Sequence, residues 1–257
     1  MTSDLTSPQP IVACWSGGKD SALMLGRLRD DARYRVVGLI TMVTAGDRRI
    51  SMHGVAAELL LSQAAAAGLP LVQAEIPAFP ANSVYEAAFA KAVDRFRSLG
   101  VHAVAFGDLF LADIHAYREQ LCARLGLEAV FPLWGEDTAN LAAEFVAQGY
   151  RATVCCVDGS KLPREAAGSE YDARFLAGLP AGVDPCGENG EFHTFVTAGP
   201  VLSRAVPVEV ASVGASRGFW YAELQSPLSG RLSLSEVEHR PVRAPVTESA
   251  HVSSKPV

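Results

Sequence analysis

The stretch "CWSGGKDSAL", residues 14–23, decides the expected fold. It follows the apolar run "IVAC" and leads into "ALMLGRLRD", whose apolar residues recur at helical spacing. A glycine-rich loop between a strand and a helix lets the backbone approach a phosphate, and the helix N-terminus adds free N–H groups. Lys19 supplies a full positive charge, while Ser16 and Ser21 supply hydroxyl donors. The stretch therefore predicts a phosphate-binding loop at the carboxyl edge of a sheet.

Two common nucleotide-binding motifs do not fit this loop. A Walker A loop has the form G-x-x-x-x-G-K-[ST], whereas Gly18-Lys19 is followed here by Asp20, and position 13 is alanine. The dinucleotide fingerprint G-x-G-x-x-G is also absent from the stretch. The loop therefore belongs to another class of phosphate site.

Apolar runs alternate with helical patterns along the first 158 residues. We expect strands over 11–16, 34–43, 71–76, 101–108, 128–134 and 151–158. We expect helices over 21–30, 54–68, 82–100, 113–126 and 137–149. Asn82 or Ser83 is the expected N-cap of the third helix, and Gly68 and Gly100 are expected helix ends. The alternation, with strands apolar on both faces, predicts an α/β fold with a doubly wound, mostly parallel sheet.

The pattern changes after about residue 159. A broken helix is expected next, then a Gly- and Pro-rich loop over 182–200 with "FHTFV" as a strand, and a hairpin over 206–224. We therefore expect an ATP-binding domain over 11–159, a smaller α+β substrate-covering part over 160–225, and a polar tail over 226–257.

Composition and charge exclude some classes of protein. Apolar residues make up 49% of the 257 residues and charged residues 19%, which supports a sizeable core. The net charge is -6, so a strongly basic nucleic-acid-binding face is not expected. The polar first ten residues do not resemble a secretory signal, and no apolar run has membrane-spanning length. Five cysteines without a C-x-x-C pair suggest reduced thiols, so we expect a cytoplasmic protein that does not bind membranes.

"SGGKDS" directly after a strand resembles the PP-loop of the ATP pyrophosphatase superfamily. Four further segments are similar to the diphthine–ammonia ligase family, and the resemblance runs from about residue 11 to 202. They are "RRISMHGV" (48–55), "AFGDLFLADIHAYRE" (105–119), "GLEAVFPLWG" (126–135) and "GVDPCGENGEFHTFV" (182–196). The resemblance implies an enzyme that adenylates a carboxylate with ATP and then forms an amide with ammonia, releasing AMP and pyrophosphate. In that family the acceptor is diphthine, a modified histidine of elongation factor 2.

The resemblance and the residue chemistry together suggest a set of site residues. Those expected at ATP are Ser16, Gly17, Gly18, Lys19, Asp20, Ser21, Met42, His53 and Gly107. The catalytic candidates are Lys19, Asp108, Glu188, Glu191 and His193. Lys19 would hold the departing pyrophosphate, and Asp20 or Asp108 would bind Mg²⁺. Glu188 and Glu191 would attract ammonium and remove a proton, and His193 is expected to titrate near neutrality.

Structural interpretations of the same residues remain open. Asp108 also suits the N-cap of the next helix, and the "GENGEFHT" carboxylates also suit a structural turn. Arg118 suits either a bound phosphate or carboxylate or a solvated helix face.

Alternative functions also remain. The same ligase chemistry would suit a small-molecule carboxylate in a bacterial cofactor pathway. A tRNA-thiolating enzyme shares the SGGKDS loop, but Cys155 and Cys156 are adjacent within an apolar strand and Cys186 stands alone, which argues against sulfur transfer. A nucleotide-binding sensor without turnover is a third class. The sequence leaves the oligomeric state open, a homodimer included.

Overall fold

Two β-sheets organise the computed structural model, which describes residues 7–46, 49–50 and 53–227. The expected polar tail lies outside the described residues from 228 onward. Residues 48, 51 and 52 of the "RRISMHGV" segment also lie outside them.

The first sheet carries the glycine-rich loop. Its strands are β1 (Gln9–Cys14), β2 (Tyr34–Thr44), β3 (Arg49–Ile50), β4 (Leu71–Ile76), β5 (Ala103–Ala105) and β6 (Glu128–Val130). Their order is β3-β2-β1-β5-β6, and β4 also pairs with β2. Only the short β3 pairs in an antiparallel way, so the prediction of a mostly parallel sheet is confirmed.

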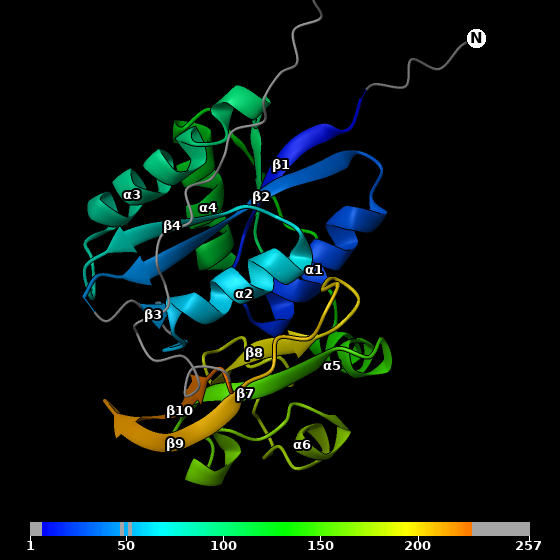
Figure 1. Ribbon diagram of the computed structural model, residues 1–257, viewed down its shortest axis with the longest axis vertical. Coiled ribbons are helices and arrows are strands. Elements are labelled where there is room, and N and C mark those ends of the chain that lie inside the picture. Colours follow the sequence, from blue (N-terminus) through cyan, green and yellow to red (C-terminus); the bar gives the residue numbers. More distant parts are fainter. Residues whose placement is uncertain (1–6, 47–48, 51–52, 228–257) are drawn as a thin grey trace, which may run out of the picture. The chain divides into compact units, whose positions relative to one another are not determined.

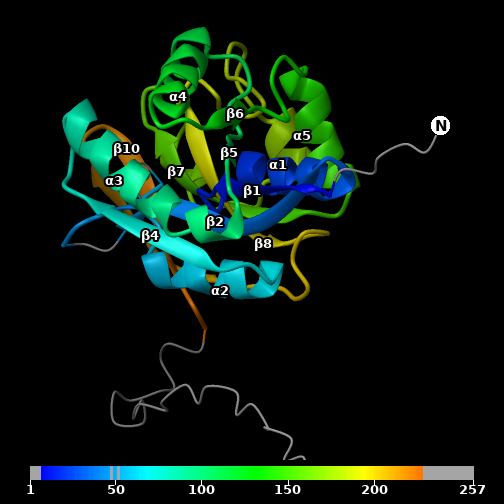
Figure 2. The ribbon, with the colours of Figure 1, turned by 90° about the horizontal axis from the view of Figure 1, so that it is seen from above.

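Helices cover both faces of this sheet, as a doubly wound fold requires. Helices α1 (Lys19–Asp30) and α2 (Ala57–Ala67) lie on the side of the second sheet, and α3 (Asn82–Asp94) and α4 (Ala112–Arg124) lie on the opposite side (Figures 1 and 2). The burial of β1 follows the same division: Ile11 and Ala13 pack in the core with α1, and Val12 packs in the core with α3. None of the helices in the described ranges is long and apolar enough to cross a membrane.

The second sheet is antiparallel throughout. Its strands are β7 (Arg151–Asp158), β8 (Phe192–Ala198), β9 (Glu209–Ser216) and β10 (Phe219–Gln225), in the order β8-β7-β10-β9. The strand predicted over 151–158 exists, but it pairs with β8 and β10 and not with the parallel sheet. Up to Pro227 the chain packs as one unit, so the expected division after residue 159 stays a prediction.

Short helices complete this half of the chain. They are α5 (Thr138–Ala147), α6 (Ala173–Ala177) and the 3₁₀ turn η2 (Arg164–Ala166). The broken helix expected after residue 159 corresponds to η2 and α6.

Some element ends differ from the sequence-based expectation. Helix α3 stops at Asp94, and a 3₁₀ turn, η1 (Arg97–Leu99), leads to Gly100 in the left-handed region. The N-cap of α3 is Ala81, which makes no side-chain hydrogen bond, so the prediction of Asn82 or Ser83 as the cap is wrong. Strand β5 ends at Ala105, earlier than predicted, and the next three residues, Phe106, Gly107 and Asp108, line a cavity.

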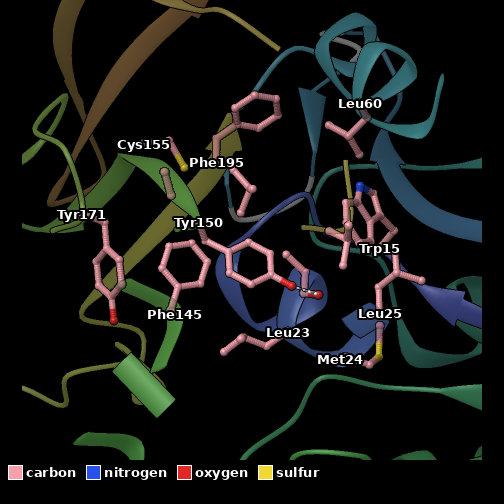
Figure 3. Packing of buried hydrophobic residues seen from close by; sticks show 14 of the residues in the cluster. Trp15, Leu23, Met24, Leu25, Leu60, Phe145, Tyr150, Cys155, Tyr171 and Phe195 are labelled. Carbon is pink, nitrogen blue, oxygen red and sulfur yellow. Dashed lines mark hydrogen bonds between the residues drawn. The ribbon is translucent and has the colours of Figure 1, made fainter. Parts of the chain in front are cut away.

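The core between the two sheets packs around α1. Figure 3 shows Phe145 and Tyr150 beside Leu23 of α1, with Cys155 and Phe195 of the second sheet in the same cluster. The Tyr150 hydroxyl reaches the helix and donates to the Ala22 carbonyl at 3.4 Å. Because α1 is packed from both sides, the loop at its N-terminus has a fixed position.

Candidate active site

The glycine-rich loop is held by the buried side chain of Gln63 on α2. Its Oε1 accepts from Trp15 Nε1 at 3.0 Å, and its Nε2 donates to the carbonyls of Gly17 at 3.0 Å and Val196 at 2.6 Å. Gly17 has a φ of +78°, and a Cβ there would lie 2.6 Å from Gln63 Oε1. Only glycine therefore suits this position of the loop.

Strand β8 of the second sheet completes the loop. Val196 N donates to the Gly17 carbonyl at 2.8 Å, and Lys19 N donates to Thr194 Oγ1 at 3.0 Å. Gly18 N donates to Ser16 Oγ at 3.2 Å within the loop itself. Residues about 175 positions apart in the sequence thus define one loop conformation.

A cavity of about 380 Å³ lies beside this loop at the carboxyl ends of β1, β2 and β5. Ten of the predicted site residues line it. They are Ser16, Lys19, Asp20, Ser21, Met42, His53, Gly107, Asp108, Glu188 and His193. Gly17, Gly18 and Glu191 are not among the lining residues. The structure therefore brings the PP-loop and most of "GENGEFHT" to one place.

Lys19 is the cation at the loop end of the cavity. Its side chain is 4% exposed, and Nζ lies 2.9 Å from Asp20 Oδ2 and 5.5 Å from the centre of the Phe192 ring. Burial lowers the pKa of Lys19, but Asp20, Cys186 and Glu188 together outweigh it and leave that pKa above its ordinary value. Lys19 is therefore charged throughout the physiological pH range.

Each of two carboxylates at the cavity has an oxygen that accepts no hydrogen bond. Asp20 Oδ1 and Asp108 Oδ2 are buried and have no hydrogen-bond partner, and Asp108 Oδ2 forms an ion pair with Arg118 Nε at 3.5 Å. Gly107 brings the two residues together, because a Cβ at Gly107 would lie 3.2 Å from the backbone carbon of Asp20. Paired oxygens of this kind suit a hard cation such as Mg²⁺, which is bound by one or two carboxylates plus phosphates and waters.

Glu188 has the titration behaviour expected of a proton acceptor. Its Oε1 accepts from Leu109 N at 2.8 Å. Burial raises the pKa of Glu188 to about 7, and the nearby Asp20 carboxylate adds to that rise. The carboxyl is therefore balanced between its two protonation states near neutral pH.

The histidines behave differently from the prediction. His53 and His193 stack with ring centres 4.5 Å apart. Burial, followed by the charge of Lys19, lowers the pKa of His193 to about 4, and burial likewise holds the pKa of His53 well below its usual value. The expectation that His193 titrates near neutrality is therefore wrong, because the folded chain removes its ring from water.

Glu191 has a structural environment. It is buried, and its Oε1 accepts from Asp184 N and from Asn189 Nδ2, each at 3.1 Å. These bonds close the turn that precedes β8, which agrees with the turn interpretation of this carboxylate. A role for Glu191 toward ammonium stays a prediction.

Several lining residues were missed by the sequence-based list. They include Trp15, Thr41, Tyr85, Phe89, Phe106, Arg118 and Thr194. The sequence left Arg118 open between binding a phosphate or carboxylate and a solvated helix face, and the structure places it in the cavity. Gln63 also had a signal, as a polar residue inside the otherwise apolar "AELLLSQAAAA". Tyr85 and the two phenylalanines had none, since their helix and strand patterns are those of ordinary core residues.

The fold and this site define an α/β protein of the PP-loop class. Residues 10–129 match the diphthamide synthase N-terminal domain, and residues 137–225 match the diphthamide synthase C-terminal domain. The chain belongs to the diphthamide synthase family. It is also similar to the diphthine–ammonia ligase of Schizosaccharomyces pombe, with 29% identity over 92 residues. That match covers 34% of this chain and 15% of the yeast protein.

We predict that Gln63→Ala destabilises the protein, because it leaves the Trp15 indole N–H and the Val196 carbonyl without their bonds to Gln63. Unsatisfied buried groups cost about 1–3 kcal/mol each, so the free energy of unfolding should fall by roughly 2–4 kcal/mol. Urea denaturation measures this change in the free energy of unfolding. Gln73→Ala, which removes a single bond to the Ala57 carbonyl, is the matched control and should cost much less. Equal losses for the two variants would contradict the role of Gln63.

We predict that Glu188 titrates with a midpoint of about 7, which ¹³C NMR of the labelled carboxyl measures directly. Because the pKa in the folded chain is raised from 4.5, the stability due to the protonated carboxyl is complete below pH 4.5 and is lost as the pH rises through about 7. The unfolding free energy of the wild type should thus fall over this range relative to Glu188→Gln. The exposed control Glu58→Gln should follow the wild type, and a flat difference between wild type and Glu188→Gln would refute the assignment.

Proposed function

We propose that this protein is an ATP-dependent ligase that joins ammonia to a carboxylate and releases AMP and pyrophosphate. The observation that carries the proposal is one cavity that holds the PP-loop with Lys19 and, facing it, Glu188 with a pKa of about 7. Membership of the diphthamide synthase family supports the same chemistry.

The first step is adenylation of the acceptor. A carboxylate oxygen attacks the α-phosphorus of ATP, the bond from that phosphorus to the oxygen bridging to the β-phosphate breaks, and pyrophosphate leaves. Negative charge grows on the leaving group, and a buried, preorganised cation stabilises such charge more than water does. Lys19 fits this role, with the hydroxyls of Ser16 and Ser21 beside it.

The second step forms the amide. Ammonia attacks the carbonyl carbon of the acyl adenylate, AMP leaves with the electrons of the C–O bond, and the nitrogen loses a proton. Glu188 is the proposed acceptor of that proton, because its pKa lies near the working pH. His193, with a pKa of about 4, is the weaker base and is better suited to a neutral hydrogen-bonding role.

A magnesium ion fits the same cavity. Asp20 and Asp108 would hold it through Oδ1 and Oδ2, the oxygens that accept no hydrogen bond. When bound, the ion would neutralise phosphate charge and orient the triphosphate. In nucleotide sites Mg²⁺ is usually bound by one or two carboxylates together with the substrate's phosphates, so two carboxylates are enough.

Diphthine on elongation factor 2 is the favoured acceptor, since the yeast relative is named diphthine–ammonia ligase. Sulfur transfer to tRNA is disfavoured. Cys155, Cys156 and Cys186 are buried, and burial raises the pKa of Cys156 and of Cys186 to about 12, so neither is a ready thiolate. A cytoplasmic location remains part of the proposal, and five free cysteines support it.

We predict that Lys19→Ala lowers AMP formation by at least about 100-fold, because it removes the cation at the leaving group. The assay supplies MgATP, ammonium and elongation factor 2 carrying diphthine, and it quantifies AMP and ADP. Lys91→Ala, which removes an exposed lysine on α3, is the control and should behave like the wild type.

A parallel assay replaces the elongation factor with the small-molecule fraction of a cell extract. AMP formed only with that fraction would keep the ligase chemistry and change the acceptor to a metabolite. ADP in place of AMP, with either acceptor, would refute the PP-loop mechanism.

A further inference from the structure

Arg118 enters the cavity from the side opposite to the PP-loop helix. It lies on α4, which packs on one face of the first sheet, while Lys19 begins α1 on the other face (Figure 2). Both side chains line the same cavity. The cavity therefore has two cations that reach it from different faces of one sheet.

Neighbouring rings fix the position of the Arg118 guanidinium. Its Nη1 donates to the Tyr85 hydroxyl at 2.9 Å, and its central carbon lies 4.8 Å from the centre of the Phe106 ring. Phe89 stacks on Phe106 with ring centres 6.1 Å apart and also lines the cavity. A guanidinium that is stacked and bonded in this way loses little further freedom when it binds a ligand.

Part of the guanidinium lacks a hydrogen-bond partner. Nε is buried without a hydrogen bond, and its only contact with a carboxylate among the described residues is an ion pair with Asp108 Oδ2 at 3.5 Å. A separation of 3.5 Å is too long for a well-formed hydrogen bond. A buried donor left without a partner costs free energy, which a ligand with a suitable acceptor would recover.

The surroundings favour a carboxylate over a phosphate as that ligand. The PP-loop and Lys19 already form a phosphate-type site at the other cation. Beside Arg118 the cavity is lined by the aromatic side chains of Tyr85, Phe89 and Phe106, which suit an organic group carrying a flat anion, and Asp108 is its charged neighbour. A carboxylate matches the planar fork of a guanidinium with two parallel hydrogen bonds.

We propose that Arg118, positioned by Tyr85, binds the acceptor carboxylate and forms a second anion subsite separate from the phosphate site of the PP-loop. The inference rests on the proposed ligase function, since that function requires a carboxylate beside ATP. Arg118 thereby selects substrates with a free carboxylate and holds that group toward the α-phosphate.

A binding experiment tests the subsite without turnover. The side-chain Nε–H signal of Arg118, assigned with Arg118→Lys, is followed by ¹⁵N NMR in the full chain with a Mg²⁺ complex of a non-hydrolysable ATP analogue. Acetate is then added at constant ionic strength, with acetamide as the uncharged probe of the same shape. We expect the signal to move with acetate and to stay in place with acetamide and with the analogue alone. No movement with acetate, or movement with the analogue alone, overturns the proposal.

Kinetics supply the second readout, with elongation factor 2 carrying diphthine as the acceptor. Arg118→Gln should raise KM for the acceptor by roughly 10- to 100-fold, as expected for loss of a charged hydrogen bond, and leave the Kd of the ATP analogue within about twofold. Arg118→Lys should recover part of the loss. The control Arg124→Gln removes the same charge from the C-terminal end of α4, where the exposed Arg124 pairs with Glu86 of α3, and should change neither constant.

The two readouts separate the two proposals. If Arg118→Gln weakens the ATP analogue as much as Lys19→Ala does, Arg118 belongs to the nucleotide site and the inference is wrong. If the wild type forms no AMP with any acceptor, the ligase function fails, and the acetate titration still decides whether Arg118 is a carboxylate subsite.

Discussion

The backbone carbonyl of Gly17 is the point at which the glycine-rich loop, helix α2 and strand β8 of the second sheet are joined by hydrogen bonds. It accepts from Gln63 Nε2 at 3.0 Å and from Val196 N at 2.8 Å, so helix α2 and strand β8 meet on it. The conformation that exposes this carbonyl requires a positive φ at residue 17. A change in the docking of the second sheet would therefore alter the PP-loop directly, and the chemistry depends on packing between the sheets.

The acidic residues in the loop before β8 fall into two groups, those that bond within the loop and one that lines the cavity. Asp184 Oδ2 accepts from Cys186 N at 3.1 Å and from Glu188 N at 2.9 Å, while Glu191 accepts from Asp184 N. These bonds shape the loop from inside. Glu188 is then free to point at the first sheet, where Leu109 N meets it. Glu188 and Glu191 are only three residues apart but differ in their environment: Glu191 bonds within the turn, and Glu188 lines the cavity.

Local patterns were sufficient for most of the fold. The bounds of β4 and β7 and the helix end at Gly68 follow from apolar runs and a left-handed glycine, which are local signals. The sequence could not predict to which sheet β7 belongs, since strand pairing depends on contacts between residues far apart in the chain. The pKa values of His193 and Glu188 were equally hidden, because burial moves both away from their ordinary values and only the folded chain determines burial. The family motifs nevertheless located the cavity, since they mark its loops.

The distribution of unsatisfied polar atoms supports the assignment of the site independently of any motif. Among the described residues, the buried side-chain atoms without a hydrogen bond are Asp20 Oδ1, His53 Nδ1, Asp108 Oδ2, Arg118 Nε and Glu191 Oε2, of which Asp108 Oδ2 and Arg118 Nε form an ion pair at 3.5 Å. All but Glu191 line the one cavity beside the PP-loop. Folded chains satisfy nearly all buried polar groups, so a cluster of exceptions needs a reason. A binding site for charged ligands is such a reason, because its polar groups form their hydrogen bonds only when substrate binds. In the free protein these groups stay without hydrogen bonds and lower its stability.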